Sequence, residues 1–186
     1  MPKPFEVMLR VIEEEYMLKP VRIMVVKDYG NVHIDGTEYP LHKGVELEVP
    51  LWLAELLVSR GVANVVETPL SIEDIARVHF ATVSARTPAE LEPLPRNFYQ
   101  EAKRFIKQLD EEIRREFNAA LLEEKQKAIQ YLLEIIDRRL TLIMQSIRSP
   151  TTIAEISSKL SQEESTLLEE IRDDVEKWKR TLTPRS

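Results

Sequence analysis

Short stretches in which apolar and polar residues alternate dominate the first third of the chain. Apolar side chains take every second position in residues 21–25 and 45–49, as expected for strands with one buried face. Asp35 and Gly36 separate two further short stretches, and this dipeptide is typical of two-residue hairpin turns. The pattern predicts an N-terminal helix over residues 5–16 and then strands at residues 21–25, 31–34, 37–39, 45–49 and 62–66.

Pro50 and Gly61 enclose a segment that is apolar on almost every face of a helix. Proline has the φ that the first helical residue requires, and glycine readily adopts the left-handed conformation that ends a helix. A helix that is apolar all round is buried on more than one side. We therefore expect Trp52, Leu53 and Leu56 to form the core of a small N-terminal module.

The second half of the chain shows helical spacing instead, with apolar residues three or four positions apart. Ser71 and Asp74 open a short predicted helix in a capping arrangement. Ser161 and Glu164 form a capping box for a last helix. Along that last helix, the residues expected in the core are Leu168, Ile171, Val175 and Trp178.

The longest predicted helix, residues 121–147, has a regular apolar seam. Six residues follow one another at intervals of 4, 3, 4, 3 and 4: Ile129, Leu133, Ile136, Leu140, Ile143 and Ile147. A mean interval of about 3.5 is typical of coiled coils. Leu132, Ile135 and Leu142 lie off the seam, so the helix is apolar on more than one side.

Two interpretations of this extra face stay open. In the first, the bundle hides the seam within the subunit and the extra face needs a neighbouring protein. In the second, the extra face meets the β-rich module or the last helix of the same chain, because periodicity does not distinguish these kinds of burial. The residues predicted to form a partner interface along this helix are Ile129, Leu132, Leu133, Ile136, Leu140, Ile143 and Ile147.

The positions of glycine and proline divide the chain into two modules. All four glycines fall before residue 62, where tight turns connect the strands, and Pro88, Pro93 and Pro95 mark a connector. We predict an α+β protein with a small N-terminal β-rich module followed by a mainly α-helical bundle domain. The predicted boundaries are 1–85 for the β-rich module, 86–95 for the connector and 96–186 for the bundle.

The charge distribution argues against nucleic acid as the main partner. Residues 1–94 carry 9 basic and 15 acidic side chains, whereas residues 95–186 carry 17 of each. An acidic chain repels phosphate, so we expect contact with DNA to be indirect. A weak DNA-facing patch at Lys177, Lys179 and Arg180 is the minority interpretation, because neighbouring acids neutralise much of their charge.

No residue pattern indicates catalysis. His33, His42 and His79 are far apart in sequence, and none lies in a metal-ligand spacing. The chain has no cysteine, no glycine-rich phosphate loop and no nucleophile motif. We expect a protein that is not an enzyme and has no catalytic, cofactor-binding or metal site. Near the N-terminus, glutamates lie where a signal peptide would have an apolar stretch. No run of apolar residues is long enough to span a membrane. We therefore expect a cytoplasmic protein without a membrane partner.

Three segments resemble the GINS family of DNA replication factors, in the subunit type whose small β-rich module precedes the helical domain. They are VPLWLA at residues 49–54, IDGTEYPLHKG at residues 34–44, and residues 93–99, which open a long amphipathic helix. The resemblance in order and spacing covers roughly residues 1–180. Arg96 and Asn97 depart from the family pattern, in which an acidic or small residue is common before the aromatic pair.

The resemblance implies a non-catalytic scaffold subunit. It implies assembly with a sister GINS subunit of opposite module order into a heterotetramer, which joins the MCM replicative helicase to a RecJ-like partner. Such a protein acts through binding energy, by holding the helicase ring in a competent conformation. The compact length is typical of an archaeal version, which would be associated with the nucleoid, whereas a eukaryotic version would be nuclear.

A second hypothesis is a nucleic-acid-binding or transcriptional adaptor with a winged-helix-like N-terminal module. The acidic balance of residues 1–94 argues against this hypothesis. DNA binding by the purified subunit alone that weakens steeply with salt would favour the adaptor over the scaffold.

Overall fold

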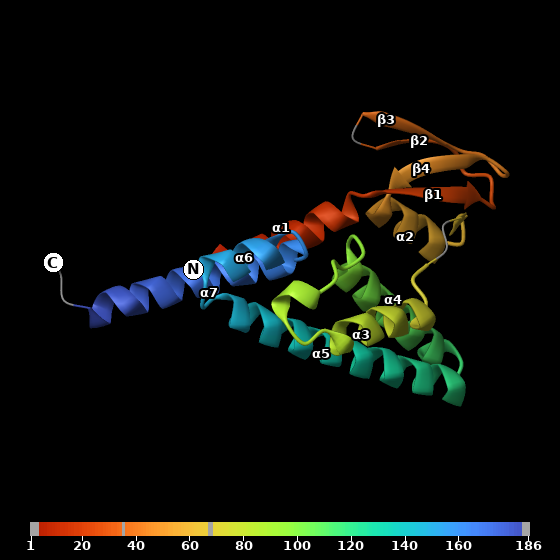
Figure 1. Ribbon diagram of the computed structural model, residues 1–186. Helices are drawn as coiled ribbons and strands as arrows, with labels where there is room; N and C mark the ends of the chain where they lie inside the picture. Colours follow the sequence, from red (N-terminus) through yellow and green to blue (C-terminus); the bar gives the residue numbers. More distant parts are fainter. Residues whose placement is uncertain (1–3, 35, 67–68, 184–186) are drawn as a thin grey trace. The chain divides into compact units, whose positions relative to one another are not determined.

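The computed structural model describes residues 4–34, 36–66 and 69–183, which fold into two compact units (Figure 1). One unit is Glu13–Pro69 and contains all the described strands. The other combines Met1–Ile12 with Leu70–Ser186 and is helical. Helix α1 (Pro4–Met17) crosses the division between the units. The predicted α+β class is confirmed, since a small β-containing region precedes a mainly helical one.

The unit Glu13–Pro69 contains a three-stranded antiparallel sheet and a separate hairpin. The sheet has the order β4-β1-β5, formed by β4 (Glu46–Pro50), β1 (Pro20–Val25) and β5 (Ala63–Val65). The hairpin consists of β2 (Gly30–Ile34) and β3 (Thr37–Leu41). Its turn contains Gly36 at φ 79°, whereas Asp35 lies outside the described residues.

The core of this unit lies between the apolar face of β1, whose buried and more exposed residues alternate, and the apolar side of α2 (Leu51–Ser59). Val21, Ile23 and Val25 are buried on one face of β1, as predicted. Helix α2 begins directly after Pro50 and is followed by Gly61, whose φ of 65° is the left-handed conformation expected of the helix stop. The limits of α2 are therefore the two residues that the sequence marks, Pro50 before the helix and Gly61 after it.

The helical unit is built around α5 (Ala119–Ser146), which packs against α3 (Ile72–Ser84) and α4 (Phe98–Arg115). A single 3-10 turn, η1 (Pro88–Glu90), lies between α3 and α4. The chain ends with α6 (Pro150–Ser157) and α7 (Gln162–Leu182). One apolar cluster joins α3, α4 and α5, and a second joins α5 to α6 and α7.

Helices α3 and α7 begin at the caps that the sequence predicts. Capping boxes are present at Ser71 for α3 and at Ser161 for α7. Asn97, one of the two residues that depart from the family pattern, precedes α4; its φ of 57° is left-handed and its side chain makes no capping hydrogen bond. Asparagine tolerates this conformation better than most residues, which accounts for its presence here.

The division between the units differs from the predicted boundary. It falls between Pro69 and Leu70, so α3 belongs to the helical unit and not to a module 1–85. Residues 86–95 are not a linker between domains, because Leu91 and the preceding Ala85 are buried in the cluster around Leu142. The prolines in this segment therefore shape a stretch that packs on the bundle.

Candidate interaction surface

Helix α5 buries one of its apolar faces completely within the helical unit. Ile135, Leu142 and Ile143 are each at most 1% exposed. Ile135 packs in the cluster formed with α3 and α4, and the other two pack in the cluster formed with α6 and α7. This inner face holds the helices of the unit together.

A second face of α5 presents a continuous row of apolar side chains to solvent. We call this row the α5 stripe; it consists of Ile129, Leu133, Ile136, Leu140 and Met144, which are 37, 56, 39, 37 and 46% exposed. They follow one another at intervals of 4, 3, 4 and 4, so they share one side of the helix. Contiguous exposed apolar residues of this kind mark interaction sites in proteins.

Four of the seven residues predicted to form a partner interface lie in the α5 stripe. The chain covers the other three: Leu132 and Ile147 are partly buried, and Ile143 is in the core. The expectation that the bundle hides the whole seam is therefore wrong. The bundle instead hides Ile135 and Leu142, which lie off the seam, together with Ile143 from the seam.

A buried ion pair fixes which face of α5 is turned inward. Arg139 is 1% exposed, and its Nε and Nη2 donate to the two carboxylate oxygens of Glu164 at 2.5 and 2.9 Å. The backbone carbonyls of Glu92 and Lys159 accept its other N–H groups at 2.9 Å. Rotation of α5 about its axis would move this guanidinium away from Glu164 and leave that buried carboxylate without its charged partner, which is strongly unfavourable.

Tyr99 on α4 completes this network by donating its hydroxyl to Glu164 at 2.6 Å. Burial and the adjacent carboxylate raise the pKa of Tyr99 well above its usual value, so the hydroxyl keeps the proton that it donates. The same Glu164 side chain accepts from the backbone N–H of Ser161 in the α7 cap. One carboxylate therefore links α4, α5 and the start of α7.

Arg138 and Arg139 are adjacent in sequence, and such a basic pair on a helix is normally expected on its solvated face. Arg138 donates to the carbonyl of Ala85, and Arg139 is in the core. A signal for its burial was present, since Arg139 follows Ile135 by four residues and precedes Leu142 by three. That spacing puts the arginine on the inner face.

His79 takes part in the contact between α3 and α5. Its ring stacks on Tyr131 with centroids 4.5 Å apart, and its Nε2 lies 2.5 Å from a carboxylate oxygen of Glu134. Gln130 donates to the other oxygen at 2.9 Å. Hydrogen bonds from Gln130 and His79 lower the pKa of the Glu134 carboxyl. His79 therefore has a structural role at the helix contact.

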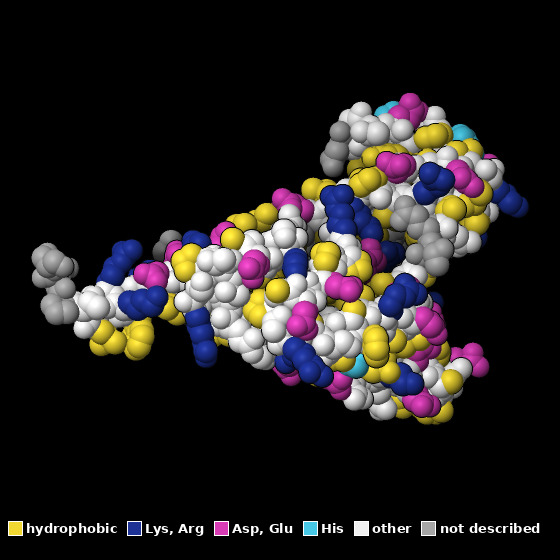
Figure 2. All heavy atoms as spheres, in the orientation of Figure 1, with side chains coloured by type: hydrophobic (Ala, Val, Ile, Leu, Met, Phe, Trp, Pro, Cys, Tyr) yellow, Lys and Arg dark blue, Asp and Glu magenta, His cyan; other side chains and the backbone are white. Residues whose placement is uncertain are grey.

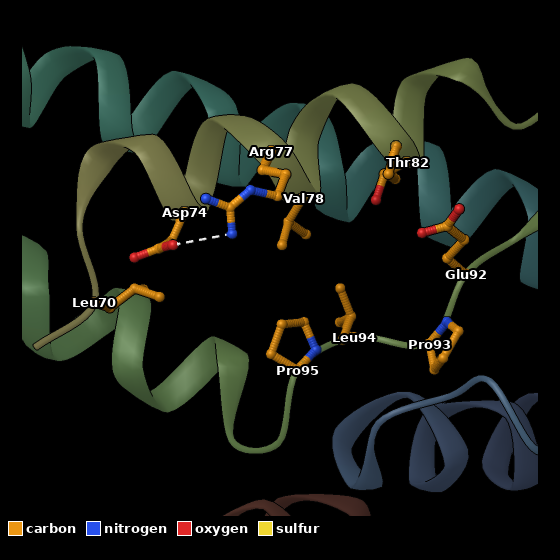
Figure 3. A pocket seen from close by; sticks show the side chains of 10 residues that line it. Leu70, Asp74, Arg77, Val78, Thr82, Glu92, Pro93, Leu94 and Pro95 are labelled. Carbon is orange, nitrogen blue, oxygen red and sulfur yellow. Dashed lines mark ion pairs between the residues drawn. The ribbon is translucent and has the colours of Figure 1, made fainter. Parts of the chain in front are cut away.

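A groove of about 340 Å³ lies between α3 and the segment at residues 92–95. In Figure 3, Val78 and Leu94 point toward one another across this groove. The ion pair of Asp74 and Arg77, at 3.2 Å, lies near one end, and Glu92 lies near the other. The Asp74 carboxylate is engaged in the α3 cap, where hydrogen bonds from Ser71 lower its pKa. The middle of the groove is therefore apolar.

Only part of the predicted module core is buried. Leu53 is in the core and Trp52 packs partly buried against it, whereas Leu56 is 44% exposed. Helix α2 contacts the strands of its own unit along one side, where Leu51, Leu53, Ala54 and Leu57 are buried. The expectation that α2 is buried on more than one side is therefore wrong for Leu56.

The basic residues near the end of α7 are exposed and lie beside acids, as the sequence indicates. Lys177 pairs with Asp174 at 3.1 Å, and Lys179 pairs with Glu176 at 2.8 Å. Arg180 is exposed on the same turn of helix. Trp178, which was expected in the core, lies exposed among them, so that expectation is wrong.

Within residues 4–34, 36–66 and 69–183, no cluster of three or more His, Asp or Glu side chains is arranged to hold a metal ion. No helix in this part of the chain is both long and apolar enough to cross a membrane. Comparisons with known protein families and with curated proteins find no match to this chain. The α5 stripe is the candidate functional site.

Proposed function

We propose that this protein is a non-catalytic scaffold subunit of a GINS-type DNA replication complex, which binds a sister subunit through the α5 stripe. The observation that carries the proposal is the exposure of five apolar residues, spaced three or four positions apart, on a helix whose other face is fixed in the core. A helix in such a position binds an apolar face of another helix, with anchors at intervals of three and four residues.

The anchored inner face makes the α5 stripe a preformed surface. The pair between Arg139 and Glu164 prevents the helix from turning the stripe inward to cover it. A partner would therefore bind without paying for a rearrangement of α5, and preorganised surfaces bind more tightly for this reason. Removal of the stripe from water supplies about 25 cal/mol for each Å² of apolar surface that is buried.

In this proposal, the chain and a sister GINS subunit of opposite module order form a heterotetramer. The complex supports the MCM replicative helicase and connects it to a RecJ-like partner, with contact to DNA only indirect. The equal numbers of acidic and basic residues in 95–186, and the acidic balance of 1–94, agree with protein partners rather than phosphate. The compartment that fits this role is the cytoplasm, at the nucleoid, or the nucleus in a eukaryote.

The adaptor hypothesis has no comparable support. A winged-helix module needs a helix–turn–helix pair beside its strands. Within the described part of Glu13–Pro69, α2 is the one helix that lies wholly inside the unit. The scaffold is therefore the function that we propose.

The test is co-purification of this chain with a candidate sister GINS subunit. Leu133→Asp places a charge at the most exposed position of the α5 stripe and should abolish co-purification while leaving the helical content unchanged. Phe80→Asp is the matched control, because Phe80 is an exposed apolar residue on α3. Retention of the sister subunit by Leu133→Asp, or equal loss in both variants, would contradict the proposal.

A further inference from the structure

The apolar row of α7 passes from the core into solvent along the helix. Leu168 is buried, Ile171 and Val175 are partly buried, and Trp178 and Leu182 are each 63% exposed. The intervals of 3, 4, 3 and 4 are those of a coiled-coil seam. In Figure 1 the last turns of α7 extend beyond the other helices of the unit. Figure 2 shows hydrophobic side chains gathered near that end, beside Lys and Arg.

Charge is segregated along the same helix. Residues 162–176 contain seven acidic side chains and one basic side chain, whereas residues 177–182 contain three basic side chains and no acid. Two such helices in parallel would place like charges side by side along their length. In the antiparallel arrangement, the basic end of each helix lies beside the acidic part of the other. The surface of α7 is therefore complementary to itself about a two-fold axis.

We propose that the exposed end of α7 is a docking surface for α7 of a second copy of this chain, in antiparallel orientation. The register follows from pairing the four apolar residues that the core does not bury completely, which are Ile171, Val175, Trp178 and Leu182. It places Ile171 opposite Leu182 of the second copy and Val175 opposite Trp178. In this register, Asp174 lies level with Lys179 of the second copy.

The ion pairs within α7 leave its charges accessible to a second copy. Lys177 and Asp174 are 72 and 66% exposed, and their pair is of the i,i+3 kind along one helix. Such solvent-exposed pairs contribute little to stability, so exchange for a contact across the interface is not costly. The surface is separate from the α5 stripe, and this inference does not depend on the proposed replication role.

Cross-linking gives a direct test of orientation, because the natural chain contains no cysteine. Ile171→Cys and Leu182→Cys variants of the full chain, one of them with a larger tag, are oxidised separately and as a mixture. Antiparallel pairing predicts that the mixture forms the mixed covalent dimer in several-fold excess over the dimer of either variant alone. Self-linking of Leu182→Cys that equals the mixed product indicates a parallel pair and overturns the proposal.

The mass of the protein in solution gives an independent test. The wild-type chain should sediment as a dimer at micromolar concentration, and the double variant Trp178→Glu with Leu182→Glu should have half that mass. Phe117→Glu is the control, since Phe117 is an apolar residue exposed outside α7 and should leave the mass unchanged. A monomeric wild-type chain, or a dimer that survives the double substitution, overturns the proposal.

Discussion

The inner and outer faces of α5 are alike in residue type and differ in what covers them. Ile135 has no exposed surface, whereas the next residue, Ile136, belongs to the α5 stripe. An apolar side chain stabilises a fold in proportion to the area that folding removes from water. The inner face therefore contributes to the folding equilibrium of the chain, and much of the outer face is left to contribute to binding. Two adjacent isoleucines on one helix thus act in different equilibria.

The most severe way to break the inner face is a charge at Ile143. Ile143→Asp should cost about 4 kcal/mol or more in the free energy of unfolding, because the carboxylate would be buried without a partner. Ile136→Asp should cost less than about 1 kcal/mol, since that side chain reaches solvent. Urea denaturation followed by circular dichroism measures both values. If both variants lost the same free energy of unfolding, the inner and outer faces of α5 would not differ in their contribution to folding.

The ion pair that orients α5 gives the next largest effect. Arg139→Met should cost about 3 kcal/mol, because Glu164 would remain buried without its charged partner. The double variant Arg139→Met with Glu164→Gln should be more stable than this single variant, since no uncompensated charge is left. The comparison is made by urea denaturation at neutral pH. A double variant less stable than Arg139→Met alone would show that the pair does not act as proposed.

The smallest effect is expected at the border of the inner face, where Glu134 meets His79. A carboxyl whose pKa is lowered in the folded protein contributes stability above its unfolded value of about 4.5, and the contribution is lost as the pH falls through the folded pKa. Glu134→Gln should therefore lower the melting temperature slightly at pH 7 and weaken the decline below about pH 4. Glu123→Gln, an exposed change on the same helix, is the control. If the melting temperature of Glu134→Gln fell at low pH as steeply as that of the wild-type chain, this role of Glu134 would be contradicted.

The strands and most helix limits could be predicted from the sequence because their signals are local. A strand has two faces, so alternation at Val21, Ile23 and Val25 is enough to identify the buried one. Pro50 and Gly61 likewise define α2 through their own backbone preferences. In each case the outcome depends on a few neighbouring residues.

The orientation of the long helices could not be predicted in the same way. Helix α5 is apolar around much of its circumference, so spacing alone did not identify which face turns inward. The deciding contact joins Arg139 to Glu164, and 25 residues separate them in sequence. The prediction for α7 failed at Trp178 for a related reason, since the helix continues past the elements that cover its first turns.

The buried Arg139 has a consequence for the order in which the chain can fold as it is synthesised. Its acceptors are spread along the chain at Glu92, Lys159 and Glu164, so its charge is compensated only after the first turn of α7 has emerged. Until then, closing α5 against the helices already made would trap a bare cation in the core. We therefore expect released fragments that end before residue 164 to remain sensitive to proteases, and fragments that include the first turn of α7 to be protected.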